Sequence, residues 1–338
     1  MNYLNKLIIL TSCALFFTCD SDMDTVEELV TAPSDGYVLY AFMGDTTIHL
    51  IDTLGNDVKT WTSSNRTSGA AYLSKTNNLL RLGATPEANT GVFSGGGAVG
   101  GLIEELNSDS DVVWSIRKED SEATFHHDFK EIDAQSIVAL SWELVNYNGN
   151  IYWNENILWI DKTSNEVIWS WSAIDDGELT PNATSQKDFL HFNAVDYKDG
   201  EILVSSRSQK SLYIINKESK TITASLTANG SLSGQHDATF LENGNILVFN
   251  NNAGPNASEV LELSRSDEIA WSYSNDFYSN HISGVSRLDN GNTIICSGVE
   301  ARFIEVTESG QEVWDFIPEH TVTFNSEEIF KIRKYTSY

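Results

Sequence analysis

Four histidines each stand at the beginning of a short β-like run. They are His127, His191, His236 and His281, in the runs HDFKEI, HFNAV, HDATF and HISGVSRL. The chain has only seven histidines, so four in one structural position indicate a shared site. A neutral imidazole, with a pKa of about 6.5, can act as a nucleophile, a general base or a metal ligand at neutral pH.

An arginine is expected beside one of these histidines. The run SSRSQ ends the strand that follows the His191 strand, so Arg207 should return to the same rim as His191. Asn193 lies two residues after His191 and is expected on the same strand face, because side chains alternate along a strand. An arginine beside imidazoles makes a bidentate site for a sulfate, a phosphate or a carboxylate.

Residue types alone leave two other interpretations of the histidines open. Converging histidines can bind zinc or iron, but the adjacent acids Asp128 and Asp237 should point to the opposite strand face, so we expect no metal. The histidines could also be hydrogen-bonded polar residues that fill a channel, with Arg207 on the surface. We expect Asp237 to anchor its strand.

A recurring tryptophan phrase divides the chain into units of about fifty residues. The phrase has an acidic or polar turn, a β-branched residue and a tryptophan, and ends at Trp61, Trp114, Trp169, Trp271 and Trp314. Each unit contains four short β-runs separated by Gly, Asn, Asp and Ser turns. Five complete units account for residues 69–317.

The two ends of the chain together supply a sixth unit. YVLYAF, TTIHLID and DVKTW give three strands before the first complete unit, and EEIFKIRKY, residues 327–335, gives one after the last. Joining them closes a ring and removes the free sheet edges. We therefore predict an all-β six-bladed β-propeller with four-stranded blades, the first blade closed by the C-terminal strand. An open solenoid or two β-sandwiches would leave the terminal strands unexplained.

In such a propeller the first strand of each blade lines the central channel, so the four histidines should meet at one mouth. The tryptophans on the outermost strands should pack between neighbouring blades.

The N-terminus has the pattern of an export signal. Residues 1–19 hold an apolar run too short to span a membrane, followed by Cys19 and acids. We predict a lipoprotein-type signal with lipidation at Cys19. Cys13 is an alternative, and so is a cleaved signal without lipid. Residues 20–34 are predicted to be a flexible acidic tether, and residues 35–338 the propeller catalytic domain. The protein would be exported and lipid-anchored in the periplasm or at the cell surface.

The charge balance excludes some partners. The formal net charge is −27, which argues against nucleic acid and anionic membrane surfaces. Membrane contact is expected only through the lipid anchor, and the oligomeric state is left open. The third cysteine, Cys296, lies within a strand-like run and is expected to be buried. An anionic substrate would need a local positive site.

Several segments resemble the bacterial arylsulfate sulfotransferase family. They are DFLHFNAVDYKDGEILVSSRSQ, GQHDATFLENGNILVFNN, FHHDF and the recurring E-V-x-W, and the resemblance extends from about Gly36 to the end of the chain. It implies a six-bladed propeller that moves a sulfuryl group from a phenolic sulfate ester to a phenol in a ping-pong cycle. The group is carried on a covalent sulfohistidine, and neither a nucleotide sulfate donor nor another cofactor is implied.

The resemblance also implies roles for individual residues. His236 matches the nucleophile, and His191, Asn193 and Arg207 match groups that bind the sulfuryl oxygens and assist the leaving phenol. His127 matches a further pocket histidine, and we count its neighbour His126 and the unassigned His281 as substrate-binding residues. The long N-terminal β-domain and the cysteine pair of well-known members are absent, which leaves the oligomeric state and the loop geometry around His236 open.

Two other functions compete with sulfuryl transfer. One is a non-catalytic propeller that binds sulfated glycans or a partner at the cell surface. The other is a polysaccharide lyase with a histidine base, for which Tyr278 is the only tyrosine near a rim loop that could act as the acid. The retained His191, Asn193 and Arg207 favour the sulfotransferase.

Overall fold

The structure is a computed structural model that describes residues 32–86, 91–119, 121–182, 184–319 and 326–338. The chain divides into residues 1–31 and a compact unit from Ala32 to Tyr338, and this unit contains all the described strands. The predicted signal, Cys13, Cys19 and most of the tether lie outside the described residues and stay predictions.

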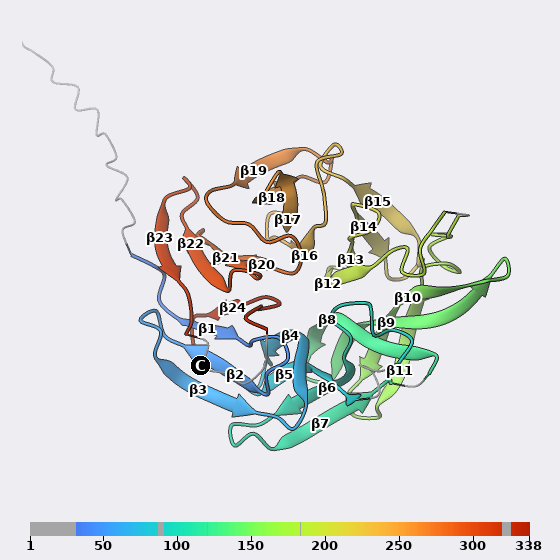
Figure 1. Ribbon diagram of the computed structural model, residues 1–338, viewed down its shortest axis with the longest axis horizontal. Coiled ribbons are helices and arrows are strands. Elements are labelled where there is room, and N and C mark those ends of the chain that lie inside the picture. Colours follow the sequence, from blue (N-terminus) through green and yellow to red (C-terminus); the bar gives the residue numbers. More distant parts are fainter. Residues whose placement is uncertain (1–31, 87–90, 120, 183, 320–325) are drawn as a thin grey trace, which may run out of the picture. The chain divides into compact units, whose positions relative to one another are not determined.

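In the described part of the chain, 24 strands form six four-stranded antiparallel sheets, arranged as the blades of a β-propeller (Figure 1). From the axis outward, the first blade consists of β24 (Arg333–Tyr335), β1 (Tyr37–Tyr40), β2 (Thr47–Ile51) and β3 (Asp57–Thr62). The second consists of β4 (Arg66–Leu73), β5 (Leu79–Ala84), β6 (Gly101–Leu106) and β7 (Val112–Arg117). The third consists of β8 (Ala123–Asp133), β9 (Ser136–Tyr147), β10 (Asn150–Asp161) and β11 (Glu166–Ser172).

The remaining three blades repeat this plan. The fourth contains β12 (Phe192–Lys198), β13 (Glu201–Ser206), β14 (Ser211–Asn216) and β15 (Ile222–Leu226). The fifth contains β16 (His236–Phe240), β17 (Ile246–Gly254), β18 (Ala257–Leu263) and β19 (Ile269–Tyr273). The sixth contains β20 (Gly284–Arg287), β21 (Thr293–Ser297), β22 (Arg302–Val306) and β23 (Glu312–Phe316). The predicted six-bladed propeller is confirmed.

The C-terminal strand closes the first blade, as predicted. β24 pairs antiparallel with β1, with Tyr335 opposite Tyr37 and Arg333 opposite Leu39. The strand is shorter than the predicted 327–335 run. Upstream of it, Ile329 forms only an isolated bridge with Phe42, and its amide donates to Gly298 of the sixth blade. This stretch bonds to two blades, which prevents a longer regular ladder.

Tryptophans on the outermost strands connect consecutive blades, as predicted. Four indole N–H groups each donate to the turn between the third and fourth strands of the next blade. The pairs are Trp114 with Asn165 Oδ1 (2.7 Å), Trp169 with Lys217 O (3.1 Å), Trp271 with Glu308 O (2.9 Å) and Trp314 with Thr53 O (3.0 Å). The last pair joins the sixth blade to the first and so supports ring closure. Trp61 instead packs its ring against the second blade, and its Nε1 has no hydrogen-bond partner among the described residues.

The hydrophobic core lies mainly between adjacent blades. Between the third and fourth blades, for example, Ile157 and Trp171 pack in one cluster with Val204 and Ile215, and all four are fully buried. Burying a side chain such as Ile or Val contributes about 1.5–3 kcal/mol. This packing makes the ring rigid enough to hold side chains at its mouth. No helix in residues 32–338, as far as they are described, has the length and apolar character needed to cross a bilayer.

Bulges interrupt the innermost strands where they begin. The pairing register shifts between Phe125 and Phe129, between Phe192 and Ala194, and between His236 and Thr239. A bulge inserts a residue and re-aims the side chains around it. His127 and His191 have positive φ angles of 50° and 52° at these places, an uncommon conformation for non-glycine residues that clusters at functional sites.

Candidate active site

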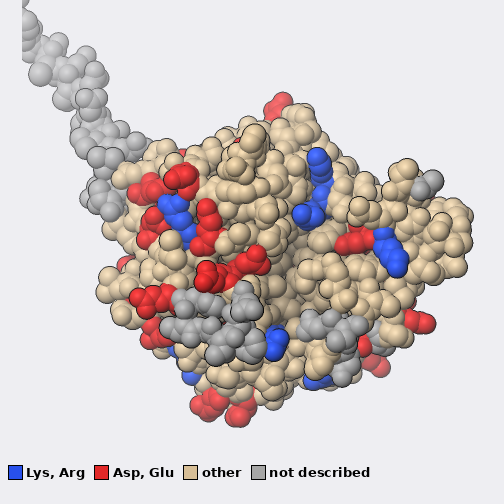
Figure 2. Space-filling model, in the orientation of Figure 1, with Lys and Arg blue, Asp and Glu red and all other residues tan. Residues whose placement is uncertain are grey.

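A cavity of about 320 Å³ opens at the mouth of the channel where the innermost strands begin. Its polar lining consists of His127, His191, Arg207, His236, His281 and Glu328, and its apolar lining of Met43, Ala98, Ile282 and Phe330, with Gly95, Gly96 and Gly97 between them. Figure 2 shows one face of the ring hollowed at its centre, with acidic side chains gathered over β20–β24 and basic ones on the side of β14 and β15.

The ring of His236 is held in one tautomer. Its Nδ1 lies 2.9 Å from the carbonyl oxygen of Gly234 and 2.8 Å from Oδ1 of Asn251. The amide nitrogen of Asn251 donates to the carbonyl oxygens of Ser279 and Ile282, so its Oδ1 must face His236. Because both neighbours of Nδ1 are acceptors, Nδ1 carries the proton. Nε2 is left with a free lone pair.

His236 is also kept neutral. Burial lowers its pKa to about 3, although the hydrogen bond that Nδ1–H donates to Asn251 acts in the opposite direction, and the positive charge of Arg207 lowers the pKa further. The ring therefore stays neutral at neutral pH, with a single proton on Nδ1. A neutral imidazole with a free Nε2 is competent as a nucleophile.

Arg207 is an unpaired cation in an acidic protein. It lies in the turn after β13, where its amide donates to the carbonyl oxygen of His191 (3.1 Å). Its guanidinium has no hydrogen bond or ion pair with any described residue, whereas six other arginines each contact a carboxylate: Arg81, Arg117, Arg265, Arg287, Arg302 and Arg333. A free guanidinium on a cavity wall is suited to bind an anion.

His191 is oriented by a carboxylate that the sequence analysis missed. Its Nδ1 lies 2.5 Å from Oδ2 of Asp188, and its ring is 4.7 Å from that of His127, centroid to centroid. The spacing D-x-x-H was visible in the run DFLH, but nothing in the sequence showed that the loop before β12 would fold back on itself.

A long segment of the chain matches a known protein family. The family model described as Arylsulfotransferase (ASST) matches residues 89–319, more than half of the chain. The chain belongs to the arylsulfotransferase family. The resemblance noted in the sequence is thereby confirmed, and the family supports an arylsulfotransferase-like function.

One solved structure supports the fold of this family member, and two others are more distantly similar. A protein of unknown function from Bacteroides caccae is 15% identical, covers 88% of this chain and 98% of its own, and superposes with a TM-score of 0.62. A functionally unknown protein from Desulfotomaculum acetoxidans DSM 771 is 12% identical over 88% of this chain and 98% of its own, with a TM-score of 0.49. Apo AztD from Citrobacter koseri is 9% identical, covers 89% of this chain and 98% of its own, and has a TM-score of 0.48. No curated protein is detectably similar in sequence.

In this arylsulfotransferase-family chain, His126 lies behind the cavity and not on its wall. Its side chain is fully buried and stacks on Trp142, with ring centroids 3.8 Å apart. Its Nδ1 lies 2.9 Å from Nδ1 of His127, and its Nε2 lies 3.0 Å from Oε2 of Glu155. His126 is counted above among the substrate-binding residues, and the structure places it outside the cavity lining, behind His127. The sequence analysis also missed Glu155, which sits in the middle of β10.

Asn193 does not share the face of His191, contrary to the prediction. The bulge between Phe192 and Ala194 breaks the alternation of side chains. Asn193 is fully buried and is not among the residues that line the cavity. Its amide nitrogen donates to the carbonyl oxygen of Gln235 (2.7 Å), so it supports the peptide that precedes His236.

His281 lines the cavity at its exposed rim. It precedes β20 by three residues, so it does not begin the strand as predicted. Its Nε2 lies 3.4 Å from Oε1 of Glu328, and both side chains are partly exposed. Tyr278, the acid required by the lyase interpretation, is outside the cavity lining, and its hydroxyl lies 3.4 Å from Asn252 Oδ1.

A buried ion cluster occupies the channel beneath the histidines. Lys331 Nζ lies 2.8 Å from Asp237 and 2.9 Å from Asp128, and these three side chains are almost completely buried. Arg333 contacts Asp237 (2.6 Å), and the hydroxyl of Tyr72 donates to Asp128 (2.6 Å). Asp237 thus anchors its strand, as predicted.

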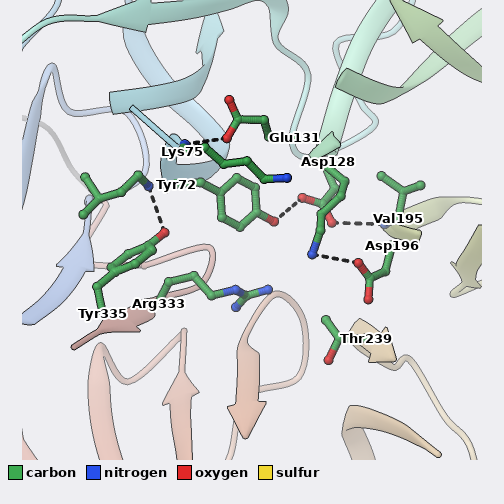
Figure 3. A pocket seen from close by; sticks show the side chains of 11 residues that line it. Tyr72, Lys75, Asp128, Glu131, Val195, Asp196, Thr239, Arg333 and Tyr335 are labelled. Carbon is green, nitrogen blue, oxygen red and sulfur yellow. Dashed lines mark hydrogen bonds and ion pairs between the residues drawn. The ribbon is translucent and has the colours of Figure 1, made fainter. Parts of the chain in front are cut away.

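A second cavity, of about 270 Å³, lies on the other side of this cluster at the ends of the innermost strands (Figure 3). Tyr72, Asp128 and Arg333 form its floor, and Lys130 pairs with Asp196 at 2.8 Å on its wall. Most of the charged side chains around it are paired with an opposite charge. Cys296 is buried, as predicted. The described residues contain no group of three or more His, Cys, Asp or Glu side chains placed to hold a metal ion.

Proposed function

We propose that the protein is an arylsulfate sulfotransferase that carries the sulfuryl group on Nε2 of His236. The observation behind this proposal is the free Nε2 of a neutral histidine in a cavity that it shares with the unpaired guanidinium of Arg207. Membership of the arylsulfotransferase family supports an aryl sulfate as donor and a phenol as acceptor.

In the first half-reaction, Nε2 attacks the sulfur of the donor ester. The N–S bond forms, the S–O bond to the aryl group breaks, and the phenolate leaves with the bonding electrons. The imidazole ring of the sulfohistidine then carries a positive charge. The two acceptors on its Nδ1–H, Gly234 O and Asn251 Oδ1, stabilise this charge.

In the second half-reaction, the oxygen of the acceptor phenol attacks the same sulfur and the N–S bond breaks. The acceptor loses its proton, and His236 returns to the neutral Nδ1–H tautomer. By analogy with phosphoryl transfer, positioning and electrostatic stabilisation of the three sulfuryl oxygens supply most of the rate enhancement.

Arg207 and His191 are placed to bind those oxygens. The arginine offers two parallel N–H donors and has no competing partner among the described residues. An imidazolium at His191 would be neutralised by Asp188 on its Nδ1 side, and its Nε2–H would donate into the cavity. Removal of one such donor typically costs about 10²–10³ in rate.

Mass spectrometry and turnover together test the proposal. Incubation with p-nitrophenyl sulfate, without acceptor, should add one sulfuryl group to a peptide that contains His236, and a phenol acceptor should remove it. His236→Ala should abolish both the adduct and the transfer. His49→Ala, which removes a histidine outside the cavity, is the matched control. Transfer that persists in His236→Ala, or a wild-type adduct on another residue, would disprove the assignment.

We also propose that the protein is exported and lipid-anchored at Cys19. The apolar run before Cys19 and the acidic residues after it support this proposal. Metabolic labelling with a radioactive fatty acid should mark the wild-type protein and leave Cys19→Ser unlabelled. Labelling that is lost only in Cys13→Ser would assign the anchor to Cys13.

A further inference from the structure

A chain of buried polar side chains runs from the cavity into the third blade. His127 lines the cavity, and its Nε2 lies beside Gly97, 3.9 Å from where a β-carbon would stand. On the other side of the ring, its Nδ1 lies 2.9 Å from Nδ1 of His126, whose Nε2 lies 3.0 Å from Oε2 of Glu155. These last two atoms lie within ion-pair distance, but neither has a hydrogen-bond partner among the described residues, so the contact is close without being an aligned hydrogen bond.

Hydrogen bonds at the far end of the chain determine which oxygen of Glu155 can take a proton. Oε1 accepts from the indole N–H of Trp142 (2.8 Å) and from the backbone N–H of Phe192 (2.7 Å). With two donors on Oε1, a proton on the carboxyl group must sit on Oε2. Oε2 is the oxygen that faces His126.

The electrostatic environment makes Glu155 the member of the chain that changes its charge. Burial raises the pKa of Glu155 well above its ordinary value, and the charge of Asp188 acts in the same direction. Burial lowers the pKa values of His126 and His127 well below theirs, so each imidazole holds a single proton. The other titratable or charged groups that act on these three residues are Asp128, His191, Arg207 and His236.

Two proton arrangements are therefore available. When Glu155 is ionised, His126 carries its proton on Nε2, facing the carboxylate across the 3.0 Å contact, and His127 donates from Nδ1 to Nδ1 of His126. Nε2 of His127 then presents a lone pair to the cavity. When Glu155 is protonated, its proton faces Nε2 of His126, the hydrogen bond between the two histidines reverses, and Nε2 of His127 presents a proton. The two arrangements differ by one proton.

We propose that Glu155, His126 and His127 form a proton relay that protonates the leaving phenolate and recovers a proton from the acceptor phenol. In the first half-reaction, His127 gives its Nε2 proton to the phenolate oxygen, His126 gives its Nδ1 proton to His127, and Glu155 gives its proton to His126. In the second half-reaction the acceptor phenol reverses each transfer. Over a full cycle no proton is gained or lost.

This inference rests on the proposed sulfuryl transfer and adds the proton pathway to it. Glu155 and His126 are fully buried and act through His127, so they are positioning and proton-storing residues. General acid catalysis of this kind contributes about 10²–10⁴ in rate. Its benefit should be largest for weakly acidic phenols, whose phenolates are poor leaving groups.

Two donors of different leaving-group acidity test the relay in Glu155→Gln. p-Nitrophenolate leaves readily without a proton, so single-turnover sulfuryl uptake from p-nitrophenyl sulfate should stay within about threefold of wild type. Uptake from phenyl sulfate, whose phenolate is a stronger base, should fall about 100-fold. An equal loss with both donors would show a merely structural effect and overturn the relay.

Trp153→Phe is the matched control. It changes a buried indole that packs against Trp142, with ring centroids 5.1 Å apart, and leaves the Glu155–His126–His127 chain and both donors on Oε1 in place, so it should slow both sulfate donors by the same factor. If wild-type protein forms no sulfohistidine with either donor, the proposed function fails, and the relay fails with it. If the wild-type protein reacts with both donors and Glu155→Gln keeps the same ratio of uptake rates between them, the relay is refuted and the proposed function stands.

Nitrogen-15 spectra of the wild-type histidines provide a measurement that does not depend on how the variants fold. After the sulfohistidine has formed and the phenol has left, the proton of His126 should have moved from Nδ1 to Nε2. A tautomer of His126 that is identical before and after sulfuryl uptake would contradict the relay.

Discussion

At the scale of single residues, the reactivity of His236 depends on the two acceptors at its Nδ1. Gly234 O and Asn251 Oδ1 fix the tautomer, and burial keeps the ring neutral. In the proposed cycle, the same acceptors would stabilise the cationic ring of the sulfohistidine. Asn251 is thus a positioning residue whose effect on proton affinity can be measured separately from its effect on structure.

Replacing Asn251 with Asp should move the acid limb of sulfuryl uptake to higher pH. A carboxylate beside Nδ1 stabilises the imidazolium and raises the pKa of His236, and the protonated ring is not a nucleophile. With p-nitrophenyl sulfate, we expect that protonation of His236 does not lower the single-turnover rate of the wild-type protein above about pH 5. The variant should lose at least about tenfold between pH 7 and pH 5.

Asn252→Asp is the control for this experiment, since it adds the same charge one residue further along β17. An acid limb that appears in both variants, or in neither, would show that the contact between Asn251 and His236 does not govern the proton affinity.

The sequence analysis found the residues that the repeat places at strand heads or turns, such as His127, His191 and Arg207. It missed Asp188, Glu155 and Asn251, because their contacts depend on which loop or strand folds against which. It also placed Asn193 on the wrong face, since a bulge in β12 left no recognisable mark in the sequence.

At the scale of elements, a buried ion pair fastens the C-terminal strand to the sixth blade. Lys334 of β24 contacts Glu305 of β22 at 2.6 Å, and both side chains are almost completely buried. Glu305 also accepts from Asn292 Nδ2 and from the amide of Ser34. Glu305 therefore holds residues from the beginning and from the end of the compact unit on the sixth blade.

Lys334→Ala should destabilise the propeller strongly. It leaves the carboxylate of Glu305 buried without its cation, a change that typically costs about 3–5 kcal/mol in free energy of unfolding. Lys198→Ala breaks an exposed pair with Glu242 and should cost less than about 1 kcal/mol. Urea unfolding curves of the two variants give the comparison, and equal losses would refute the structural role of the buried pair.

The repeat made the blade architecture predictable, because the tryptophan phrase marks each outer strand and the terminal runs add up to one unit. The length of β24 was not predictable. Residues 328–330 pair partly with the first blade and partly with the sixth, and apolar alternation alone cannot show that a run is divided between two partners.

At the scale of the whole molecule, three buried neutral histidines make the fold sensitive to mild acid. Burial lowers the pKa values of His126, His127 and His236 below the value of about 6.5 in an unfolded chain. Below about pH 6.5 the unfolded chain therefore binds protons that the folded protein does not. Each such proton reduces the free energy of unfolding by about 1.4 kcal/mol per pH unit.

The thermal midpoint should consequently fall between pH 7.5 and pH 5.5. The raised pKa of Glu155 acts in the opposite direction, but its effect on the free energy of unfolding is smaller than the summed effect of the three histidines. Differential scanning calorimetry should show a shallower pH dependence in His127→Gln than in wild type, with His49→Gln as the control for loss of a histidine outside the cavity. A wild-type midpoint that is constant or rises on acidification would contradict this account.

The ion cluster of Tyr72, Asp128, Asp237, Lys331 and Arg333 makes the channel a dead end. These side chains lie between the histidine cavity and the cavity at the opposite mouth. In the proposed cycle, and as far as the described residues show, a phenol therefore enters and leaves through the same mouth as the donor. Two aryl rings would have to share one opening and a space of about 320 Å³. The departure of the first phenol is then a physical precondition for the arrival of the second, so a slowly released product should inhibit the enzyme by blocking its entrance.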